Sequence, residues 1–237
     1  MTQPSDKRES IFDTPAYPAS EAARILNLSV NTVRSWCFGQ NYRSSAGETK
    51  RFQPVIKPSN TKDKLLSFAN LCELHVLSAI RRHHRIPLPK VRESMSYLRA
   101  ELSSSRPLLD RQFLTNGIDL FVEQALQLLN VSQQGQKAMR GDFETALARI
   151  ERDSKGAPIR LFPFSRTSGE DKHQPKAIVV DPRLAFGRPV LSSVAVRTDV
   201  IVGRFRAGDS MAEMAKDYGV DEKEIEEALR FEQRRSA

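Results

Sequence analysis

Small and apolar residues recur with one spacing in two stretches of the chain. A small residue is followed four positions later by Asn or Gly, and ten and thirteen positions later by apolar residues: Ala23, Asn27, Val33 and Trp36, then Ala215, Gly219, Ile225 and Ala228. The small residue lets two helices touch, Asn or Gly tolerates a tight turn, and the apolar residues pack the second helix onto the first. The spacing predicts a helix-turn-helix at residues 20–36 and another at 212–228.

The pattern after the first of these units predicts a hairpin and two helices. Residues 39–60 have basic arms on either side of a turn-like Ser44-Ser45-Ala46-Gly47, which is typical of a β-hairpin wing. Residues 65–84 place apolar side chains at helical spacing, so we expect a helix buried on one face. After a break at Pro87 and Pro89, a second amphipathic helix is expected from Lys90 to Leu102, with Val91, Met95 and Leu98 facing inward.

The middle of the chain mixes strand-like and helix-like patterns. Asn116-Gly117 before the partly alternating run 118–122 favours a hairpin turn followed by a strand. We expect a helix over 135–153, ended by Gly156-Ala157-Pro158, and a strand over 159–164. The polar stretch 165–176 is then the best candidate for a linker.

The last sixty residues predict a small hairpin and three helices. Short strands are expected at 177–180 and 190–191, and helices near 198–206, 210–218 and 222–233. Asp209-Ser210 and Asp221 are good helix caps, and Gly208 and Gly219 suit the turns.

These patterns predict a mainly α fold with small β-hairpins. We expect a disordered tail at 1–14 and a winged helix-turn-helix domain at 15–102. A middle α/β segment (103–164) and the linker (165–176) would then lead to a C-terminal β-hairpin and three-helix domain at 177–234, which makes protein contacts.

Charge separates the two helix-turn-helix units. The whole chain carries a formal charge of +8, but residues 24–92 hold 13 Lys or Arg against three carboxylates, whereas residues 207–232 hold three against nine. A concentrated basic excess is the electrostatic footprint of a polyanionic partner. The acidic unit is unsuited to DNA, because carboxylates facing phosphates are repelled.

The first unit contains the candidate DNA-binding residues. With Ser29 as N-cap and Val30, Val33 and Trp36 inward, the second helix turns Asn31, Thr32, Arg34 and Ser35 outward. Such side chains bond base edges and phosphates. Arg43, Lys50 and Arg51 on the wing are candidates for contacts with the DNA backbone. The alternative is an ordinary helical hairpin with a polar, solvated face.

The acidic final helix is a candidate protein interface. The candidate interface residues of this helix are Glu222, Glu224, Glu226, Glu227, Arg230 and Phe231. The alternative is again a solvated face of a small helical domain.

Other features carry less chemistry. Arg81-Arg82-His83-His84-Arg85 suits nucleic acid, but cations also favour the C-terminal dipole of a helix. Cys37, Cys72 and His75 lack paired metal-ligand spacing, and buried Cys is common, so no metal or cofactor is expected. The chain has no recognised catalytic motif and is not expected to be an enzyme. The chain has only two Cys, and it shows no signal region and no long apolar run. We therefore expect a cytoplasmic protein without a membrane partner.

Two segments resemble known families. Residues 17–36 (YPASEAARILNLSVNTVRSW), the basic hairpin and the helix pair to residue 102 resemble the winged DNA-binding domain of MerR-type regulators. Residues 178–232 are similar to a small domain, formerly of unknown function, found in bacterial antitoxins. The matching residues are Asp181-Pro182-Arg183, Gly187-Arg188-Pro189-Val190, the turn Ala207-Gly208-Asp209-Ser210 and the acidic last helix.

Together these segments resemble VapB-type antitoxins with a MerR-like N-terminal domain. The resemblance implies a PIN-domain ribonuclease toxin as partner, held inactive by the chain, and repression of the chain's own operon through double-stranded operator DNA. We expect a homodimer, or a higher hetero-oligomer with toxin, because one short recognition helix reads few base pairs. Two alternatives stay open, a ligand- or metal-responsive MerR-like regulator and a protein adaptor that does not read DNA.

Overall fold

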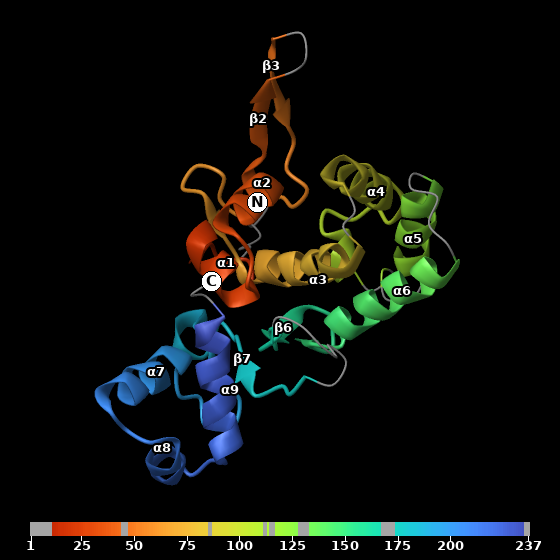
Figure 1. Cartoon of the computed structure of the whole chain (residues 1–237). Coiled ribbons are helices and arrows are strands. Elements are labelled where there is room, and N and C mark those ends of the chain that lie inside the picture. Colours follow the sequence, from red (N-terminus) through yellow and green to blue (C-terminus); the bar gives the residue numbers. More distant parts are fainter. Residues whose placement is uncertain are drawn as a thin grey trace, which may run out of the picture.

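A computed structural model describes residues 11–43, 47–84, 87–110, 113, 117–127, 133–166 and 174–234. The fold is mainly helical with small two-stranded sheets, as the sequence predicts (Figure 1). Of the tail expected at 1–14, residues 1–10 lie outside the described residues. Residues 11–14 are described. Among the described residues, no helix is long and apolar enough to cross a membrane.

The N-terminal part is a helix-turn-helix followed by a hairpin. Its elements are β1 (Tyr17–Pro18), α1 (Ala19–Leu26), α2 (Val30–Phe38), β2 (Gln40–Arg43) and β3 (Thr49–Phe52). Asn27 adopts the left-handed conformation that the turn requires, with φ of 53°. β2 and β3 pair antiparallel and form the predicted wing, which projects from the body at the top of Figure 1.

The long helix α3 (Phe68–His84) lies at the centre of the first hydrophobic core. It follows β4 (Leu65–Leu66), which pairs with β1. The expectation that this helix is buried on one face is wrong, because every residue from Phe68 to Ala79 is buried. Helices α1 and α6 (Gln133–Leu147) pack against it, and polar residues such as Asn70, Glu73 and His75 are enclosed with the apolar ones.

The next helices confirm one prediction and correct another. α4 (Leu88–Glu101) buries Val91, Met95 and Leu98 as expected. After the short 3-10 helix η1 (Pro107–Leu109), the predicted strand at 118–122 is instead α5 (Ile118–Gln127). Ile118, Phe121 and Val122 are buried at helical spacing, and packing of α5 against α4 and α6 decides the outcome. Asn116 of the expected turn lies outside the described residues.

The helix expected over 135–153 ends earlier than predicted. After Leu147 at the end of α6, the chain forms β5 (Ile150–Arg152), which pairs antiparallel with β6 (Pro158–Leu161). Asp153 accepts hydrogen bonds from the backbone N–H groups of Lys155 and Ala157, which closes the turn between these strands. Gly156 and Pro158 therefore belong to a hairpin.

The C-terminal part has the hairpin and three helices that the sequence predicts. β7 (Ile178–Val179) pairs with β8 (Val190–Leu191) around the 3-10 helix η4 (Ala185–Gly187). α7 (Thr198–Ala207), α8 (Met211–Tyr218) and α9 (Glu222–Gln233) follow. Ser210 forms a capping box with Glu213, Asp221 caps α9, and Gly208 and Gly219 end α7 and α8 in the left-handed conformation.

Several contacts join this C-terminal part to the rest of the molecule. Leu161 and Val180 exchange backbone hydrogen bonds of 3.0 and 2.8 Å. The buried Arg149 donates to the carbonyl oxygens of Phe162, Pro163, Gln174 and Pro175, and so fixes both ends of the expected linker. Residues 167–173 of that linker lie outside the described residues, whereas Ser165 and Gln174 at its ends are buried.

Candidate nucleic-acid interface

Helix α2 presents one apolar and one polar side. Ser29 Oγ accepts a hydrogen bond from the backbone N–H of Thr32 at 3.0 Å and caps the helix. Val33 and Trp36 are buried in the first core. Asn31 and Arg34 are exposed, and Thr32 and Ser35 are half-buried beside them. The polar side of α2 therefore faces outward, which is the placement that the helical spacing predicts.

The wing adds cations next to this helix. Its register pairs Asn41 with Arg51, and Arg43 with Thr49. The rings of Tyr42 and Phe52 stack with centroids 3.9 Å apart, which stiffens the hairpin. Arg43 is exposed. Arg51 is also exposed and donates to the carbonyl oxygen of Phe38 at 3.0 Å, so its guanidinium is held near the end of α2.

Lys50 lies on β3, opposite Tyr42, but its side chain lies outside the part of the structure that is described. A cation that the sequence did not single out lies at the base of the wing. Arg92 of α4 lies 4.5 Å from the centre of the Phe52 ring and donates to the carbonyl oxygen of Gln53.

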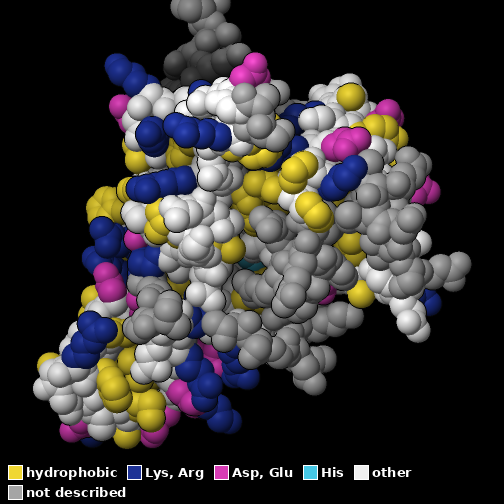
Figure 2. All heavy atoms as spheres, turned by 45° about the horizontal axis from the view of Figure 1, so that its top comes forward, with side chains coloured by type: hydrophobic (Ala, Val, Ile, Leu, Met, Phe, Trp, Pro, Cys, Tyr) yellow, Lys and Arg dark blue, Asp and Glu magenta, His cyan; other side chains and the backbone are white. Residues whose placement is uncertain are grey.

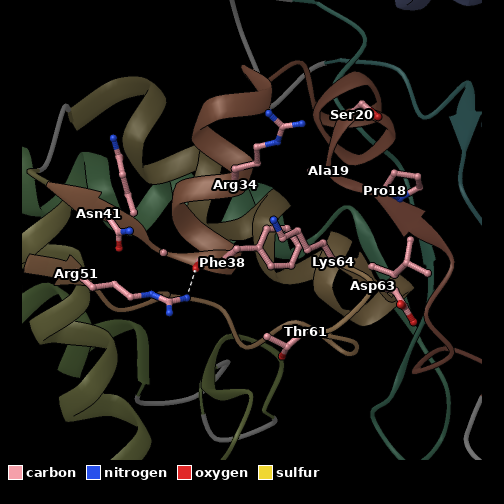
Figure 3. Close-up of a pocket in the computed structure, with 13 residues that line it drawn as sticks. Pro18, Ala19, Ser20, Arg34, Phe38, Asn41, Arg51, Thr61, Asp63 and Lys64 are labelled. Atoms are coloured by element: carbon pink, nitrogen blue, oxygen red, sulfur yellow. Dashed lines mark hydrogen bonds between the residues drawn. The ribbon is translucent and has the colours of Figure 1, made fainter. Parts of the chain in front are cut away.

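A cleft of about 620 Å³ lies between α2, the wing and the start of α1. Figure 3 shows that Arg34 reaches it from α2, Arg51 from the wing, and Lys64 from the loop before β4. Asp63 also lines it. Asn60 Nδ2 donates to the Asp63 carboxylate, and Asn60 Oδ1 accepts a hydrogen bond from the Asp63 backbone N–H. Lys64 adopts a left-handed backbone, with φ of 55°.

Lys64 and Asn41 also line the cleft, although the sequence does not single them out as candidates. The signal for Lys64 was the polar run Asn60-Thr61-Lys62-Asp63-Lys64 between two apolar stretches, which marks a turn rich in cations. Only the fold shows that this turn stands opposite α2 across the cleft.

The surface over this region is basic but not exclusively so. Figure 2 is turned so that the wing end comes forward, and it shows several Lys and Arg side chains along the left flank with a few carboxylates among them. Glu48 and Asp63 are the acidic residues of segment 24–92 that the structure leaves exposed. Cations with a neighbouring polar helix can neutralise phosphates and bond base edges.

The acidic helix α9 is partly engaged within the chain. Glu222 and Arg230 are exposed, Arg230 pairs with Glu226, and Glu224 accepts a hydrogen bond from Ser193. Two expectations need correction. Glu227 is buried and accepts hydrogen bonds from Ser165 and Arg166, and Phe231 is fully buried in the C-terminal core. Both side chains face inward because α9 packs against α7, α8 and β7.

The remaining candidate residues are either buried or have side chains that the structure does not describe. Cys37 and Cys72 are free and buried, and burial raises the pKa of both thiols far above the ordinary value. His75 is buried and its ring stacks on Phe164. The described residues contain no group of three potential metal ligands. The side chains of Arg81–Arg85 are not among the described ones.

Two family models match separate segments of the chain. Residues 15–95 match a family model described as a "Putative DNA-binding HTH domain", and residues 178–231 match the family described as "Protein of unknown function (DUF433)". In the crystal structure of Rv2018 from Mycobacterium tuberculosis, the fold is similar with a TM-score of 0.65 and 21% identity, covering 92% of this chain and 99% of that one.

Two curated proteins of Mycobacterium tuberculosis (strain ATCC 25618 / H37Rv) are similar in sequence. One, named "Uncharacterized protein Rv2308", is 25% identical, with 94% of this chain and 92% of the relative covered. The other, named "Putative antitoxin VapB45", is 27% identical, with 92% of this chain and 94% of the relative covered. The chain is therefore similar over nearly its whole length to a protein named as a VapB antitoxin, with a helix-turn-helix domain near its start and a DUF433 match near its end.

Proposed function

We propose that this chain is an antitoxin that binds double-stranded operator DNA with α2 and the wing and represses its own operon. The observation that carries the proposal is the outward side of α2, where Asn31 and Arg34 are exposed beside a cationic cleft. The similarity to a protein named as an antitoxin and the match to a helix-turn-helix family support it. In this role the chain is a cytoplasmic regulator and not an enzyme.

The proposed contacts fall into two classes. Asn31 and Arg34 read base edges in the major groove, since Asn bonds adenine and Arg bonds guanine in two-point contacts. Thr32 and Ser35 lie beside them and bond phosphates or bases. Arg43, Lys50, Arg51 and Lys64 neutralise the phosphate backbone, which positions the domain without reading sequence.

A titration of the full chain tests the DNA part. The protein is titrated with its own upstream duplex and with a scrambled duplex at about 150 mM salt. We expect the upstream duplex to bind at least about tenfold more tightly. Arg34→Ala should remove most of that preference, because one two-point base contact contributes about 1–3 kcal/mol of discrimination.

Arg230→Ala is the matched control, since it removes the same charge from α9, away from the cleft. Arg51→Ala should weaken binding to both duplexes equally and reduce the salt dependence by about one phosphate contact. Equal, weak and strongly salt-dependent binding of both duplexes by the wild type would contradict the proposal and favour a protein adaptor.

The proposed protein partner is a PIN-domain ribonuclease toxin. We assign the contact to the exposed side of α9, with Glu222, Glu226 and Arg230, since Glu227 and Phe231 face inward. A basic surface that attracts RNA would be covered by these carboxylates. The alternative of a metal-responsive regulator needs Cys37 and Cys72 as metal ligands. Both thiols are buried in the core, so this structure does not favour that alternative.

Charge reversal tests the assignment to α9. The double variant Glu222→Lys and Glu226→Lys should lose binding to a nuclease encoded beside this gene, while its circular dichroism spectrum stays that of the folded wild type. The double variant Glu101→Lys and Glu123→Lys, at two exposed positions outside the C-terminal part, is a control of the same charge change. If the double variant binds the nuclease as tightly as the wild type does, this side of α9 is not the toxin interface.

A further inference from the structure

Phe186 projects from the C-terminal part into solvent. Its side chain is 96% exposed, the highest value among the described large hydrophobic residues. A single exposed aromatic needs no explanation when its chain is mobile, but this one is held in place.

The backbone around Phe186 is strained and fixed. Ala185, Phe186 and Gly187 have consecutive positive φ angles of 46°, 56° and 75°. Backbone hydrogen bonds from Gly187 to Leu184 and from Arg188 to Ala185 close the turn, and the buried Tyr17 donates to the carbonyl oxygen of Gly187 at 3.1 Å. Non-glycine residues in this conformation persist where the surrounding structure imposes it, and such strain clusters at binding sites. A ring held rigidly outward loses little freedom on binding.

Two cations, Arg183 and Arg188, lie on the same loop, before and after Phe186 in the sequence. Arg183 and Arg188 are each about half exposed. The guanidinium of Arg183 bonds Asp181, and that of Arg188 lies 3.9 Å from Asp199 at the start of α7. The projection is therefore an aromatic tip on a loop that also carries two half-exposed cations.

A hollow with the opposite character lies between α8 and α9. Its volume is about 590 Å³, within the range of pockets that hold small molecules, and so large enough for an aromatic ring. Met211, Ala215 and Val220 supply apolar lining, and Asp221, Glu222 and Glu226 supply carboxylates beside the one cation Lys223.

The projection and the hollow of one chain lie at opposite ends of α9. The loop that carries Phe186 leads to Pro189, whose carbonyl oxygen bonds Thr198, and Thr198 in turn bonds Glu232 near the end of α9. The hollow includes Asp221 and Glu222 at the start of that helix, which is about 16 Å away along its axis. Because the loop is fixed, Phe186 cannot reach the hollow of its own chain.

We infer that Phe186 of one copy of this chain docks in the α8–α9 hollow of a second copy, with Arg183 and Arg188 facing the carboxylates Asp221 and Glu222. The occupant follows from complementarity, since the same molecule offers an aromatic tip on a loop with two cations and an apolar hollow among carboxylates. This contact needs neither DNA nor toxin. Glu222 and Glu226 also belong to the face proposed for toxin, so the test uses the chain alone.

Sedimentation velocity of the full chain, without DNA, measures the contact between about 1 and 100 μM. We expect reversible self-association of the wild type. Phe186→Ala should raise the dissociation constant at least about tenfold, because buried aromatic anchors dominate such interfaces. Phe205→Ala, which removes another exposed phenylalanine from the same domain, is the matched control and should leave association unchanged.

A charge exchange tests the pairing. Arg188→Glu and Glu222→Lys should each weaken association, and the double variant should recover it. A monomeric wild type over the whole range, or equal effects of Phe186→Ala and Phe205→Ala, would overturn the inference. So would a double variant no better than its single parents. None of these results bears on operator or toxin binding, which the titrations above test separately.

Discussion

At the scale of single residues, Glu73 carries a carboxyl group enclosed in the first core. Its side chain is 1% exposed, Asn70 donates to it at 3.0 Å, and Arg106 lies 3.7 Å away. Burial raises the pKa of Glu73 to about 7, which the nearby Arg106 and the hydrogen bond from Asn70 only partly oppose. The folded chain therefore holds a proton that the unfolded chain releases near pH 4.5.

This shift makes stability fall as pH rises. Between about pH 4.5 and 7 the unfolded chain loses the Glu73 proton while the folded chain retains it, so the free energy of unfolding declines by at most about 3 kcal/mol. Glu73→Gln should remove this decline, since the amide does not titrate and its oxygen still accepts from Asn70. Urea unfolding of both proteins at several pH values measures the difference. Parallel pH profiles of wild type and variant would refute the prediction.

Two features require glycine at position 187: the close approach of the Tyr17 side chain and a positive φ angle. A Cβ atom there would lie 2.0 Å from Tyr17 Oη, and φ is +75°. Gly187→Ala should lower the free energy of unfolding by about 2 kcal/mol or more, because strain and displacement of Tyr17 add. Gly219→Ala, with φ of +68° and open space around it, should cost only about 1 kcal/mol. Equal losses in chemical unfolding would show that the Tyr17 contact contributes nothing.

At the scale of elements, the sequence predicted those parts whose signals are local. Ser29, Ser210 and Asp221 cap helices where expected, and the basic hairpin forms on either side of the expected turn. Helical spacing with Val33 and Trp36 inward also predicts that Asn31 and Arg34 face outward, as they do. Each of these features depends on residues that are close to one another in the sequence, so the sequence alone is enough to predict it.

Tertiary packing decided the elements that the sequence did not predict. The run 118–122 is partly alternating, and only the groove between α4 and α6 makes Ile118, Phe121 and Val122 one buried face. Glu227 and Phe231 face inward because of residues as distant as Ser165. Lys64 joins the candidate site across a cleft whose walls lie far apart in sequence, which no local pattern encodes.

The two serine caps allow a prediction about the recognition helix. Ser29→Ala and Ser210→Ala should each cost about 1 kcal/mol of stability, because each leaves a helix N-terminus without its side-chain acceptor. Only Ser29→Ala should also weaken operator binding, since α2 carries the proposed base contacts. Thermal unfolding and the DNA titration measure the two effects. Equal DNA affinities of the two variants would separate the Ser29 cap from DNA binding.

At the scale of the whole molecule, a polar contact ties the DNA-binding part to the C-terminal part. Arg24 of α1 donates to both carboxylate oxygens of Glu232 at 3.3 Å, and also to Glu21. Glu232, which is mostly buried, accepts a hydrogen bond from Thr198 at 2.6 Å. Tyr17, at the start of the same helix-turn-helix, bonds Gly187. The two parts are thus joined by hydrogen bonds, among which those between Arg24 and Glu232 are charge-assisted.

This arrangement predicts that the two parts unfold together because of a few side chains. Arg24→Ala and Glu232→Ala should each be destabilising, and the double variant should cost less than their sum by about 1–2 kcal/mol, since the partners interact directly. Calorimetry adds a second reading. In Glu232→Ala the van't Hoff enthalpy should fall below the calorimetric enthalpy, because the C-terminal helices then melt apart from the first core. Additive single effects with an unchanged enthalpy ratio would mean that the backbone bridge between Leu161 and Val180 suffices to couple the two parts.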